Sequence, residues 1–447
     1  MKASHRKKRI LLVLPDGKIH KLRLGPLNIS FREAPLTATM LAALVPPELD
    51  AGITIIDESV QKIPFHKHYD LVGISCMTGT APRAYEIADR FRKQRATVVL
   101  GGVHVTLMPD EAARHADAIV IGFAEKSWPE LLRDFQRNQL KPCYHSEKIY
   151  LSHLPYPRRD LQKRFGYAIP NTVFVTRGCR GACDFCTVPA AQFGWHKRPI
   201  TDVIDEIKQI KTRRIAFSDV NLPDDAEYAK EFFKALIPLK KEWGGLASTR
   251  IAQDEELLLL MRQSGCKFLL IGFESVNSSS LKSIRKGFNK VGQYQELVRK
   301  LHDLQIIIQG CFIFGLDEDD NSVFGRTLEL VNELKIDIPR YAIYTPYPGT
   351  AAFKRLQKEN RILHYNWKYY DTQHVVFKPN KMIPQELDEG FKWAYKHTFS
   401  LKSTLQRTHG SGQNFPISFV GNVAYRLYIK RLCAEQQRFP ESDKNGL

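Results

Sequence analysis

Long apolar runs are missing from this sequence. The longest, such as Ile10–Leu14 and Phe268–Gly272, fall far short of the roughly 20 residues that a membrane-spanning helix needs. The N-terminal apolar run is followed at once by Pro15 and Gly17, which is not the pattern of a signal peptide. We therefore expect a cytoplasmic protein.

Cysteine is scarce and unevenly placed. The chain has 8 cysteines in 447 residues, and three of them crowd into the segment 179–186, so we do not expect a disulfide scaffold. No second CxxC pair is present, and the other cysteines stand singly. A reducing compartment and metal ligation by the crowded cysteines fit this usage better.

Acidic residues are outnumbered by basic ones. Asp and Glu total 48 against 66 Lys and Arg, a net charge of +18 that would suit nucleic acid, a membrane surface or an anionic substrate. The basic residues form no stripe interleaved with aromatics, so nucleic acid is not an expected partner. With 43% hydrophobic and 26% charged residues, a chain of this length predicts two or three folded domains.

The first third of the chain alternates buried-strand and helix patterns. Helical spacing separates the apolar runs, as in 83–94 and 109–116, and this predicts a parallel, doubly wound sheet of the flavodoxin-like kind. Such sheets bind ligands beyond the carboxyl ends of their strands. The predicted strands are Ile10–Leu14, Ile53–Ile56, Leu71–Ser75, Val98–Leu100 and Ala118–Ile121.

A second alternating series follows a segment rich in Pro, Tyr, Lys and Arg. Six strand-helix units predict a partial TIM-like (β/α)6 barrel, with its chemistry at the carboxyl ends of the strands. The predicted strands begin near 172, 214, 246, 267, 307 and 338. Beyond about 355 the pattern is helical. The expected domains are 1–140 (doubly wound sheet), 141–170 (linker), 171–350 (barrel) and 351–447 (helical).

The segment Thr176–Val188, TRGCRGACDFCTV, directly follows the first barrel strand. Its thiols, Cys179, Cys183 and Cys186, have the spacing Cx3Cx2C in a loop loosened by glycines. Three thiolates so close together can converge on one iron-sulfur cluster, whose fourth iron then lacks a protein ligand and can bind a chelating molecule. A structural zinc site is the alternative, but such sites usually take four ligands as two pairs.

This cysteine pattern resembles the radical-SAM superfamily, in which Phe185 matches the aromatic residue that commonly precedes the last cysteine. The resemblance implies an oxygen-sensitive 4Fe-4S cluster, held by the three cysteines, that reduces S-adenosylmethionine (SAM) to a 5'-deoxyadenosyl radical. An external electron donor, flavodoxin or ferredoxin, would reduce the cluster.

Polar residues at later strand ends are candidates for the SAM site. Asp219 and Asn221 are similar to the superfamily element that binds the methionyl amino group, although Val220 departs from the common pattern. Ser248 and Arg250 follow the third strand, where the planar guanidinium could pair with the methionyl carboxylate. Glu274, after the fourth strand, could accept hydrogen bonds from ribose hydroxyls. The structural alternatives are a helix cap for Asp219 and an ion pair between Glu274 and Arg250.

The stretches 73–89 and 99–125 resemble the cobalamin-binding domain fused to one radical-SAM subfamily. The expected contacts with cobalamin come from three loops at one sheet edge: Ser75, Thr78 and Gly79; Gly101, Gly102 and His104; and Gly122 and Glu125. The DxHxxG signature is absent, so the lower ligand of cobalt is left open, and His104 is interpreted as a loop residue. A flavodoxin-like domain without cofactor is the alternative.

Together these resemblances imply a cobalamin-dependent radical-SAM enzyme that methylates an unactivated carbon of a small molecule. Lipids, isoprenoids and tetrapyrroles are the candidate substrate classes. The nearest alternative is an oxidative cyclase like the anaerobic porphyrin-ring cyclases. A tRNA methylthiotransferase and a non-catalytic corrinoid sensor are more distant ones. The basic, amphipathic segment 417–432 either contacts a membrane surface or packs on its own domain, which is the commoner case.

Overall fold

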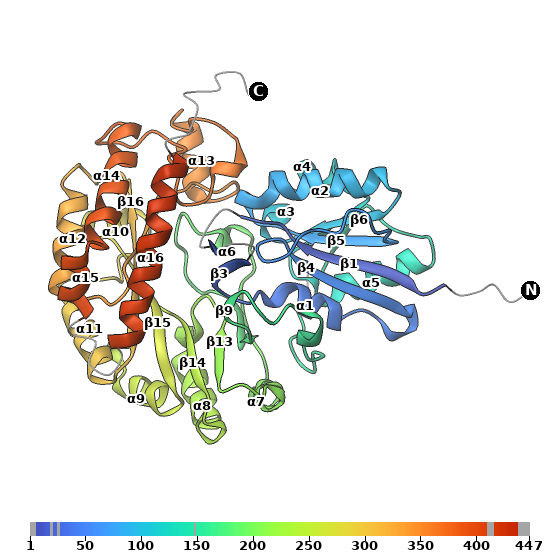
Figure 1. Cartoon of the computed structure of the whole chain (residues 1–447), viewed down its shortest axis with the longest axis horizontal. Coiled ribbons are helices and arrows are strands. Elements are labelled where there is room, and N and C mark those ends of the chain that lie inside the picture. The colour runs from blue at the N-terminus through green and yellow to red at the C-terminus, as the bar shows by residue number, and fades with distance from the viewer. Residues whose placement is uncertain (1–5, 18–20, 25–26, 147–148, 409–414, 437–447) are drawn as a thin grey trace, which may run out of the picture. The chain divides into compact units, whose positions relative to one another are not determined.

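The computed structural model describes residues 6–17, 21–24, 27–146, 149–408 and 415–436. The chain forms two compact units. The first contains residues 1–172 and 190–202, and the second contains residues 173–189 and 203–447. Figure 1 shows their strands and helices along the chain.

The first unit contains a six-stranded parallel sheet in the order β4-β1-β5-β6-β7-β8. This flavodoxin-like order confirms the doubly wound fold, and it places a topological switch point between β1 and β5. The five predicted strands are all present. The strands are β1 (Lys8–Leu14), β4 (Ala51–Asp57), β5 (Leu71–Ser75), β6 (Thr97–Gly101), β7 (Ala118–Ile121) and β8 (Cys143–His145).

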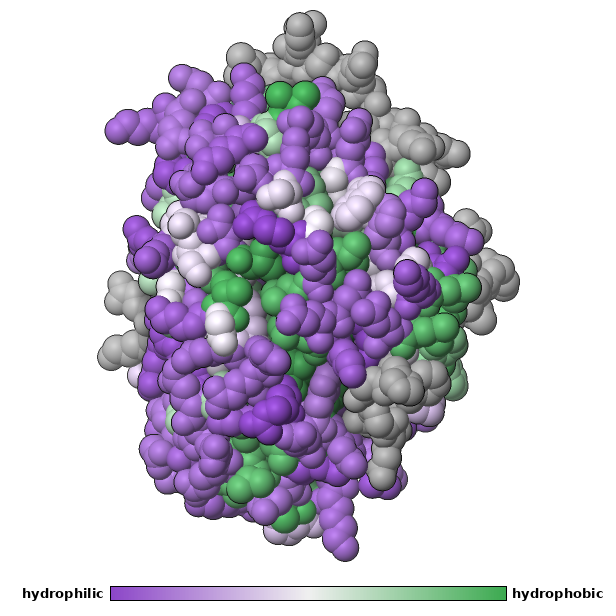
Figure 2. Space-filling model, turned by 90° about the vertical axis from the view of Figure 1, so that its left-hand side faces the viewer, coloured by the Kyte–Doolittle hydropathy of each residue, from purple (hydrophilic) through white to green (hydrophobic). Residues whose placement is uncertain are grey.

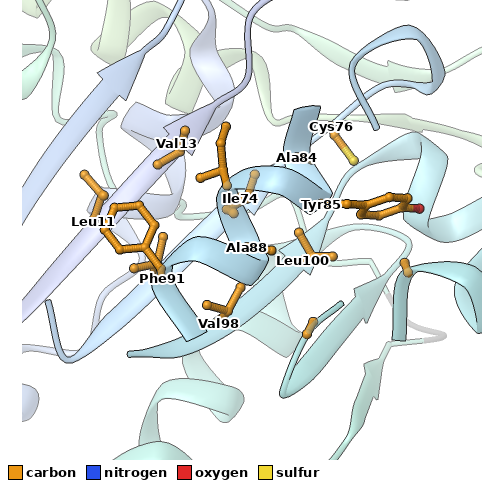
Figure 3. Packing of buried hydrophobic residues seen from close by; sticks show 14 of the residues in the cluster. Leu11, Val13, Ile74, Cys76, Ala84, Tyr85, Ala88, Phe91, Val98 and Leu100 are labelled. Atoms are coloured by element: carbon orange, nitrogen blue, oxygen red, sulfur yellow. The ribbon is translucent and has the colours of Figure 1, made fainter. Parts of the chain in front are cut away.

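Side chains of this sheet alternate between two buried faces. Leu11 and Val13 belong to the core beneath α2 (Ala81–Lys93), where Phe91 is fully buried. Figure 3 shows these side chains converging between helix and sheet. Ile10 and Leu12 belong to the opposite core, which includes Trp128 of α5 (Ala124–Gln136). Burial on both faces explains why the strands read as continuous apolar runs.

The predicted linker, 141–170, contains regular structure. Besides β8, it contains η3 (Arg159–Leu161) and β9 (Tyr167–Ile169), which pairs in parallel with β3 (Leu27–Glu33). β3 in turn pairs with β2 (Lys21–Leu24). Short strands in a segment rich in Pro and Tyr give little apolar periodicity, so this small sheet could not be seen in the sequence.

The second unit is built on a six-stranded sheet in chain order, β10-β13-β14-β15-β16-β17, the strand order of a partial barrel. The third strand begins at Glu242, earlier than predicted. Gly244 and Gly245 near its start interrupt the apolar pattern from which a strand is predicted. The strands are β10 (Thr172–Val173), β13 (Arg214–Phe217), β14 (Glu242–Ala247), β15 (Cys266–Glu274), β16 (Ile307–Phe314) and β17 (Arg340–Ile343). Helices between them include α8 (Ala226–Leu236), α9 (Glu255–Gln263), α10 (Ser278–Ser283), α11 (Tyr294–Asp303) and α12 (Val323–Glu333).

Helices dominate the end of the chain. They are α13 (Ala351–Lys358), α14 (Pro384–Thr398), α15 (Leu401–Thr408) and α16 (Phe415–Gln436). Arg407 is fully buried and donates hydrogen bonds to the carbonyl oxygens of Ile336 and Thr398 and to Asn422 of α16. Figure 2 shows the side on which α12, α14 and α15 lie in Figure 1, largely hydrophilic with separate apolar patches. Among the described residues, no helix is both long and apolar enough to cross a membrane.

Candidate functional site

The three predicted cluster cysteines lie in the loop that follows β11 (Thr176–Gly178). All three are free thiols, and each is partly exposed. Gly181 lies between them: a Cβ added there would be 3.2 Å from the Cys179 sulfur and 4.0 Å from the Cys183 sulfur. In the described part of the chain, no three acidic, His or Cys side chains are already gathered at distances suited to a single metal ion.

Burial controls the ionisation of these thiols. It raises the pKa of Cys183 to about 11, and Lys286 opposes that rise. Burial also raises the pKa of Cys179 and of Cys186, while N–H groups of Gly181 and Val188 act in the opposite direction. Because a ligating cysteine must be a thiolate, cluster assembly at this loop releases protons.

The cysteine loop is fixed from inside the second unit by Asp184, which sequence reasoning missed. Its carboxylate accepts a 2.9 Å hydrogen bond from the Tyr344 hydroxyl beyond β17, and Arg355 of α13 lies 3.7 Å away. Its carbonyl accepts a hydrogen bond from Ala352 N–H. The ring of Phe185 meets Tyr344 edge-on at 6.3 Å between centroids. Only the position of Asp184 between two of the cysteines hinted at this role.

Asp219 and Asn221 lie just beyond β13, and both contact backbone. The buried Asp219 carboxylate accepts hydrogen bonds from Val175 N–H, Thr176 N–H and the Thr176 hydroxyl, the last at 2.6 Å. Burial raises the pKa of Asp219 to about 6. Asn221 accepts from Ser248 N–H at 3.0 Å, so it links the ends of β13 and β14. Asp219 caps no helix; Asp225 is the N-cap of α8.

Glu274 pairs with Lys286, not with Arg250. The Lys286 ammonium lies 2.6 Å from the Glu274 carboxylate, and both side chains are largely buried. Arg250 is exposed in η6 (Thr249–Gln253), with its guanidinium 4.1 Å from the centroid of the Phe288 ring. Ser248 is the N-cap of that short helix. The structure therefore brings Glu274 and a missed lysine toward the cysteines. Binding of SAM by these residues stays a prediction.

Two of the three predicted cobalamin loops meet at Gly102. This residue has φ +100°, and a Cβ there would lie 2.5 Å from the Cys76 carbonyl oxygen and 2.9 Å from the Ser75 hydroxyl. Cys76 N–H donates to the carbonyl of Gly101. Only glycine allows this approach between the ends of β5 and β6. The predicted groups at this sheet edge therefore do lie together.

The side chains of Thr78 and His104 point at each other. The fully buried imidazole of His104 has one ring nitrogen 3.3 Å from the Thr78 hydroxyl. Its other nitrogen lies 3.1 Å from the Tyr85 hydroxyl and 3.3 Å from Glu111. Gly79 is partly exposed beside Thr78 in η2 (Thr78–Thr80). Both nitrogens of His104 have protein partners, and the residue lies in the short helix α3 (Val103–Leu107), not in a loop as predicted.

The third loop follows β7. Gly122 has φ +78°, and its N–H donates a 3.0 Å hydrogen bond to Thr106 of α3 (Val103–Leu107). Glu125, partly exposed, lies in the first turn of α5. The loops after β5, β6 and β7 thus line one edge of a parallel sheet, where ligands of such folds bind.

The donor set fits the cofactors that the sequence implies. Three partly buried thiols in one loop, two of them within 4.0 Å of the Cβ position of Gly181, are suited to an iron-sulfur cluster, because soft sulfur suits iron of that kind. A parallel sheet with closely approached glycine loops provides the edge for a corrin cofactor. These features define a protein with a radical-SAM barrel and a cofactor-binding flavodoxin-like domain.

Comparisons with known families agree with this assignment. Residues 173–331 match the Radical SAM superfamily, and residues 9–132 match the B12 binding domain. The solved structure of the cobalamin-dependent SAM radical enzyme OxsB with aqua-cobalamin bound covers 97% of this chain and 75% of its own, with 15% identity and a TM-score of 0.67. The predicted fold class and the cofactors, 4Fe-4S cluster, SAM and cobalamin, are confirmed.

Named relatives extend over almost the whole chain. Bacteriochlorophyllide d C-12(1)-methyltransferase of Chlorobaculum tepidum is 31% identical over 446 residues, 96% of this chain and 95% of the relative. The C-8(2)-methyltransferase of the same organism is 31% identical over 91% of this chain and 93% of its own. The chain belongs to the family of cobalamin-dependent radical SAM methyltransferases, and the predicted enzyme class is confirmed.

The alternative reaction has a weaker counterpart. An anaerobic magnesium-protoporphyrin IX monomethyl ester cyclase of Cereibacter sphaeroides is 25% identical over 71% of this chain and 57% of its own length. Methyl transfer is therefore better supported than oxidative cyclisation.

Proposed function

We propose that this enzyme methylates an unactivated carbon on a side group of a tetrapyrrole. The observation that carries the proposal is the similarity to two bacteriochlorophyllide d methyltransferases, each 31% identical over more than nine-tenths of this chain. Identity over both units means that the shared region includes the cysteine loop and the cobalamin edge. The carbon that receives the methyl group is not assigned.

The cofactors supply the difficult chemistry. When bound, cluster and SAM provide a radical that abstracts hydrogen, and cobalamin provides the methyl group. The protein binds and orients the cofactors and excludes water. Cys179, Cys183 and Cys186 would ligate the cluster, and the loop that carries them is fixed by Asp184 at one end and by Asp224, which accepts from Arg180 N–H at 2.7 Å, at the other.

Charged groups near the cysteines are paired with each other. Glu274 has φ +66° at the irregular end of β15, which directs its carboxylate to Lys286. A polar ligand with both an amino and a carboxylate group matches such a pair of opposite charges. We propose that Glu274 and Lys286 contact SAM, with Ser248, Asn221 and Arg250 around it and Asp219 holding the backbone.

The proposed activity has a direct test. Anaerobically purified protein, reconstituted with iron, sulfide and cobalamin, is supplied with reductant, SAM carrying a deuterated methyl group, and chlorophyllide-type tetrapyrroles. Methylation adds the labelled methyl mass to the tetrapyrrole and produces S-adenosylhomocysteine and 5'-deoxyadenosine together. No labelled tetrapyrrole, with active cofactors present, would rule out this function. Oxidative cyclisation would instead give 5'-deoxyadenosine without S-adenosylhomocysteine.

We infer a cytoplasmic setting and an external one-electron donor, flavodoxin or ferredoxin, since the cluster must be reduced. A net charge of +18 favours encounter with an acidic donor protein.

One face of α16 packs on its own unit through Tyr428 and Ile429, while Ile417, Val420 and Leu427 are exposed. That exposed stripe is compatible with peripheral membrane contact. Flotation with anionic vesicles tests this, with Val420→Glu as the variant expected to reduce any binding.

A further inference from the structure

One cation inside the second unit has no counter-charge. Arg340 is the first residue of β17 and stands beside Cys311 in the parallel register with β16. The next residue, Tyr341, is buried on the helix-covered face, where its ring lies 5.0 Å from that of Tyr395 in α14. Because side chains alternate along a strand, Arg340 and Cys311 project from the opposite face, the interior of the partial barrel.

The groups that act most strongly on Arg340 are uncharged. They are the Cys311 thiol and the hydroxyls of Tyr395, Tyr425 and Tyr428. Burial raises the pKa of Cys311 to about 12, so this thiol carries no charge at pH 7. Burial likewise raises the pKa of Tyr425, whose hydroxyl accepts a 2.7 Å hydrogen bond from Gln309.

A guanidinium in such a place requires a partner. Among the described residues, Arg340 has no ion pair, side-chain hydrogen bond or aromatic ring beneath its guanidinium. Arginine keeps its proton at any pH that proteins tolerate, so it cannot become neutral as a buried lysine can. A partly buried charge without a counter-ion is costly, and an anionic group on a ligand would reduce that cost.

Arg340 also lies near the reaction site. Burial raises the pKa of Tyr347, Asp371 and Cys186 add to the rise, and Arg340 opposes it, so Tyr347 is within electrostatic range of both Arg340 and a predicted cluster cysteine. Asp371, the carboxylate in this region, is already occupied by His374 at 2.9 Å. Cys311, beside Arg340, is influenced by Glu274 and Lys286.

We propose that Arg340 binds a free carboxylate on the substrate, with Gln309 and Tyr425 beside it. The planar guanidinium can hold a carboxylate through two hydrogen bonds, which would fix one end of the molecule. The neighbouring tyrosine rings supply flat apolar contacts for the rest. This inference rests on the proposed function and narrows it: the tetrapyrrole is recognised as a free acid, not as an ester.

The test compares a chlorophyllide-type free acid with its methyl ester, a pair that differs only in the carboxylate. Binding to the reconstituted holoenzyme is measured anaerobically by tetrapyrrole absorbance. Wild type is expected to bind the acid about 10- to 100-fold more tightly than the ester, the value of a charged hydrogen-bonded pair. Arg340→Met should bind acid and ester equally, and Arg340→Lys should keep part of the preference. Arg299→Met, which removes an exposed arginine of α11 paired with Asp303, is the control and should match wild type.

Each other result has a distinct meaning. Equal binding of acid and ester by wild type overturns the inference and leaves the tetrapyrrole assignment intact, even if Arg340→Met does not fold. Arg340→Met that keeps the acid preference but binds SAM or cobalamin more weakly assigns the arginine to a cofactor and also overturns it. Binding of neither tetrapyrrole by wild type removes the proposed substrate, and this inference with it.

Discussion

Lys286 lies 2.6 Å from Glu274, and this ion pair places a buried positive charge within electrostatic range of all three predicted cluster cysteines. Burial lowers the pKa of Lys286, but Glu274, Cys183 and Cys186 together outweigh burial and raise the pKa overall. The pair is thus a single unit, in which each charge depends on the other.

Removing one partner of this pair should destabilise the protein more than removing both charges. Lys286→Met leaves Glu274 buried and uncompensated, at an expected cost of about 3 kcal/mol in the free energy of unfolding. Glu274→Gln combined with Lys286→Met should recover at least half of that loss. Equilibrium urea unfolding of Glu274→Gln, of Lys286→Met and of the double variant measures these changes in unfolding free energy. A double variant whose loss equals the sum of the single losses would show that the two charges are independent.

Cluster assembly should depend on three cysteines and not on the others. Cys179→Ala, Cys183→Ala and Cys186→Ala are each expected to lose the iron absorbance and 5'-deoxyadenosine formation after anaerobic reconstitution, because each removes a ligand. Cys143→Ser, which changes an exposed thiol of β8, is the matched control and should retain full iron content. Full iron in any of the three alanine variants would contradict the ligand assignment.

The approach of β5 and β6 predicts a strong effect at one glycine. Gly102→Ala would place a methyl group 2.5 Å from the Cys76 carbonyl at a φ of +100°. Strain of about 1–3 kcal/mol must open the loop, and cobalamin affinity should fall by about 10- to 100-fold. In Gly52→Ala, on β4, the added methyl group meets nothing closer than 3.9 Å, so affinity should be unchanged. Spectroscopic titration with cobalamin compares the two, and equal affinities would contradict the prediction.

The stability of the fold should depend on pH through Asp319, which lies outside the candidate site. Its fully buried carboxylate accepts hydrogen bonds from the Ser280 hydroxyl at 2.9 Å and Leu316 N–H at 3.0 Å, and burial raises its pKa to about 6. Between about pH 4 and 6 the folded protein therefore holds a proton that the unfolded chain has lost, so stability falls as pH rises through this range.

The contribution of Asp319 to stability should decrease by about 1 kcal/mol between pH 5 and 7.5. The difference in unfolding free energy between wild type and Asp319→Asn isolates this contribution, since other groups cancel. The exposed Asp303→Asn variant should show no such slope. A wild-type to Asp319→Asn difference that is constant with pH would mean that the carboxylate titrates at its ordinary pKa when folded.

The sequence predicted most strands but not all of their limits. Continuous runs such as Leu71–Ser75 are unambiguous because both faces of a parallel sheet are buried. β14 begins at Glu242, earlier than predicted, because Gly244 and Gly245 have no side chains that could contribute to an apolar pattern. The strands within 141–170 were missed because their partner is β3 or β7, far away in sequence, and such pairing leaves no local periodicity.

The site residues also divide into those that the local sequence predicts and those that only the fold brings together. The three cysteines could be predicted as cluster ligands because they are close neighbours in sequence. The role of Lys286 could not be predicted, because it is one of two adjacent basic residues, Arg285 and Lys286. The positive φ of Glu274 and the fold of α10 bring the Lys286 ammonium and the Glu274 carboxylate together. An ion pair between Arg250 and Glu274 was the structural alternative to SAM binding, and the structure instead pairs Glu274 with Lys286.

The sequence by itself determined the two folds and the cofactor class, and it predicted the cluster ligands, because these depend on local spacing and on the periodicity of burial. Tertiary structure alone decided which of the described charges are paired. Glu274 pairs with Lys286, while Arg340 has no ion pair among the described residues, since the partners of a side chain are set by how strands and helices pack.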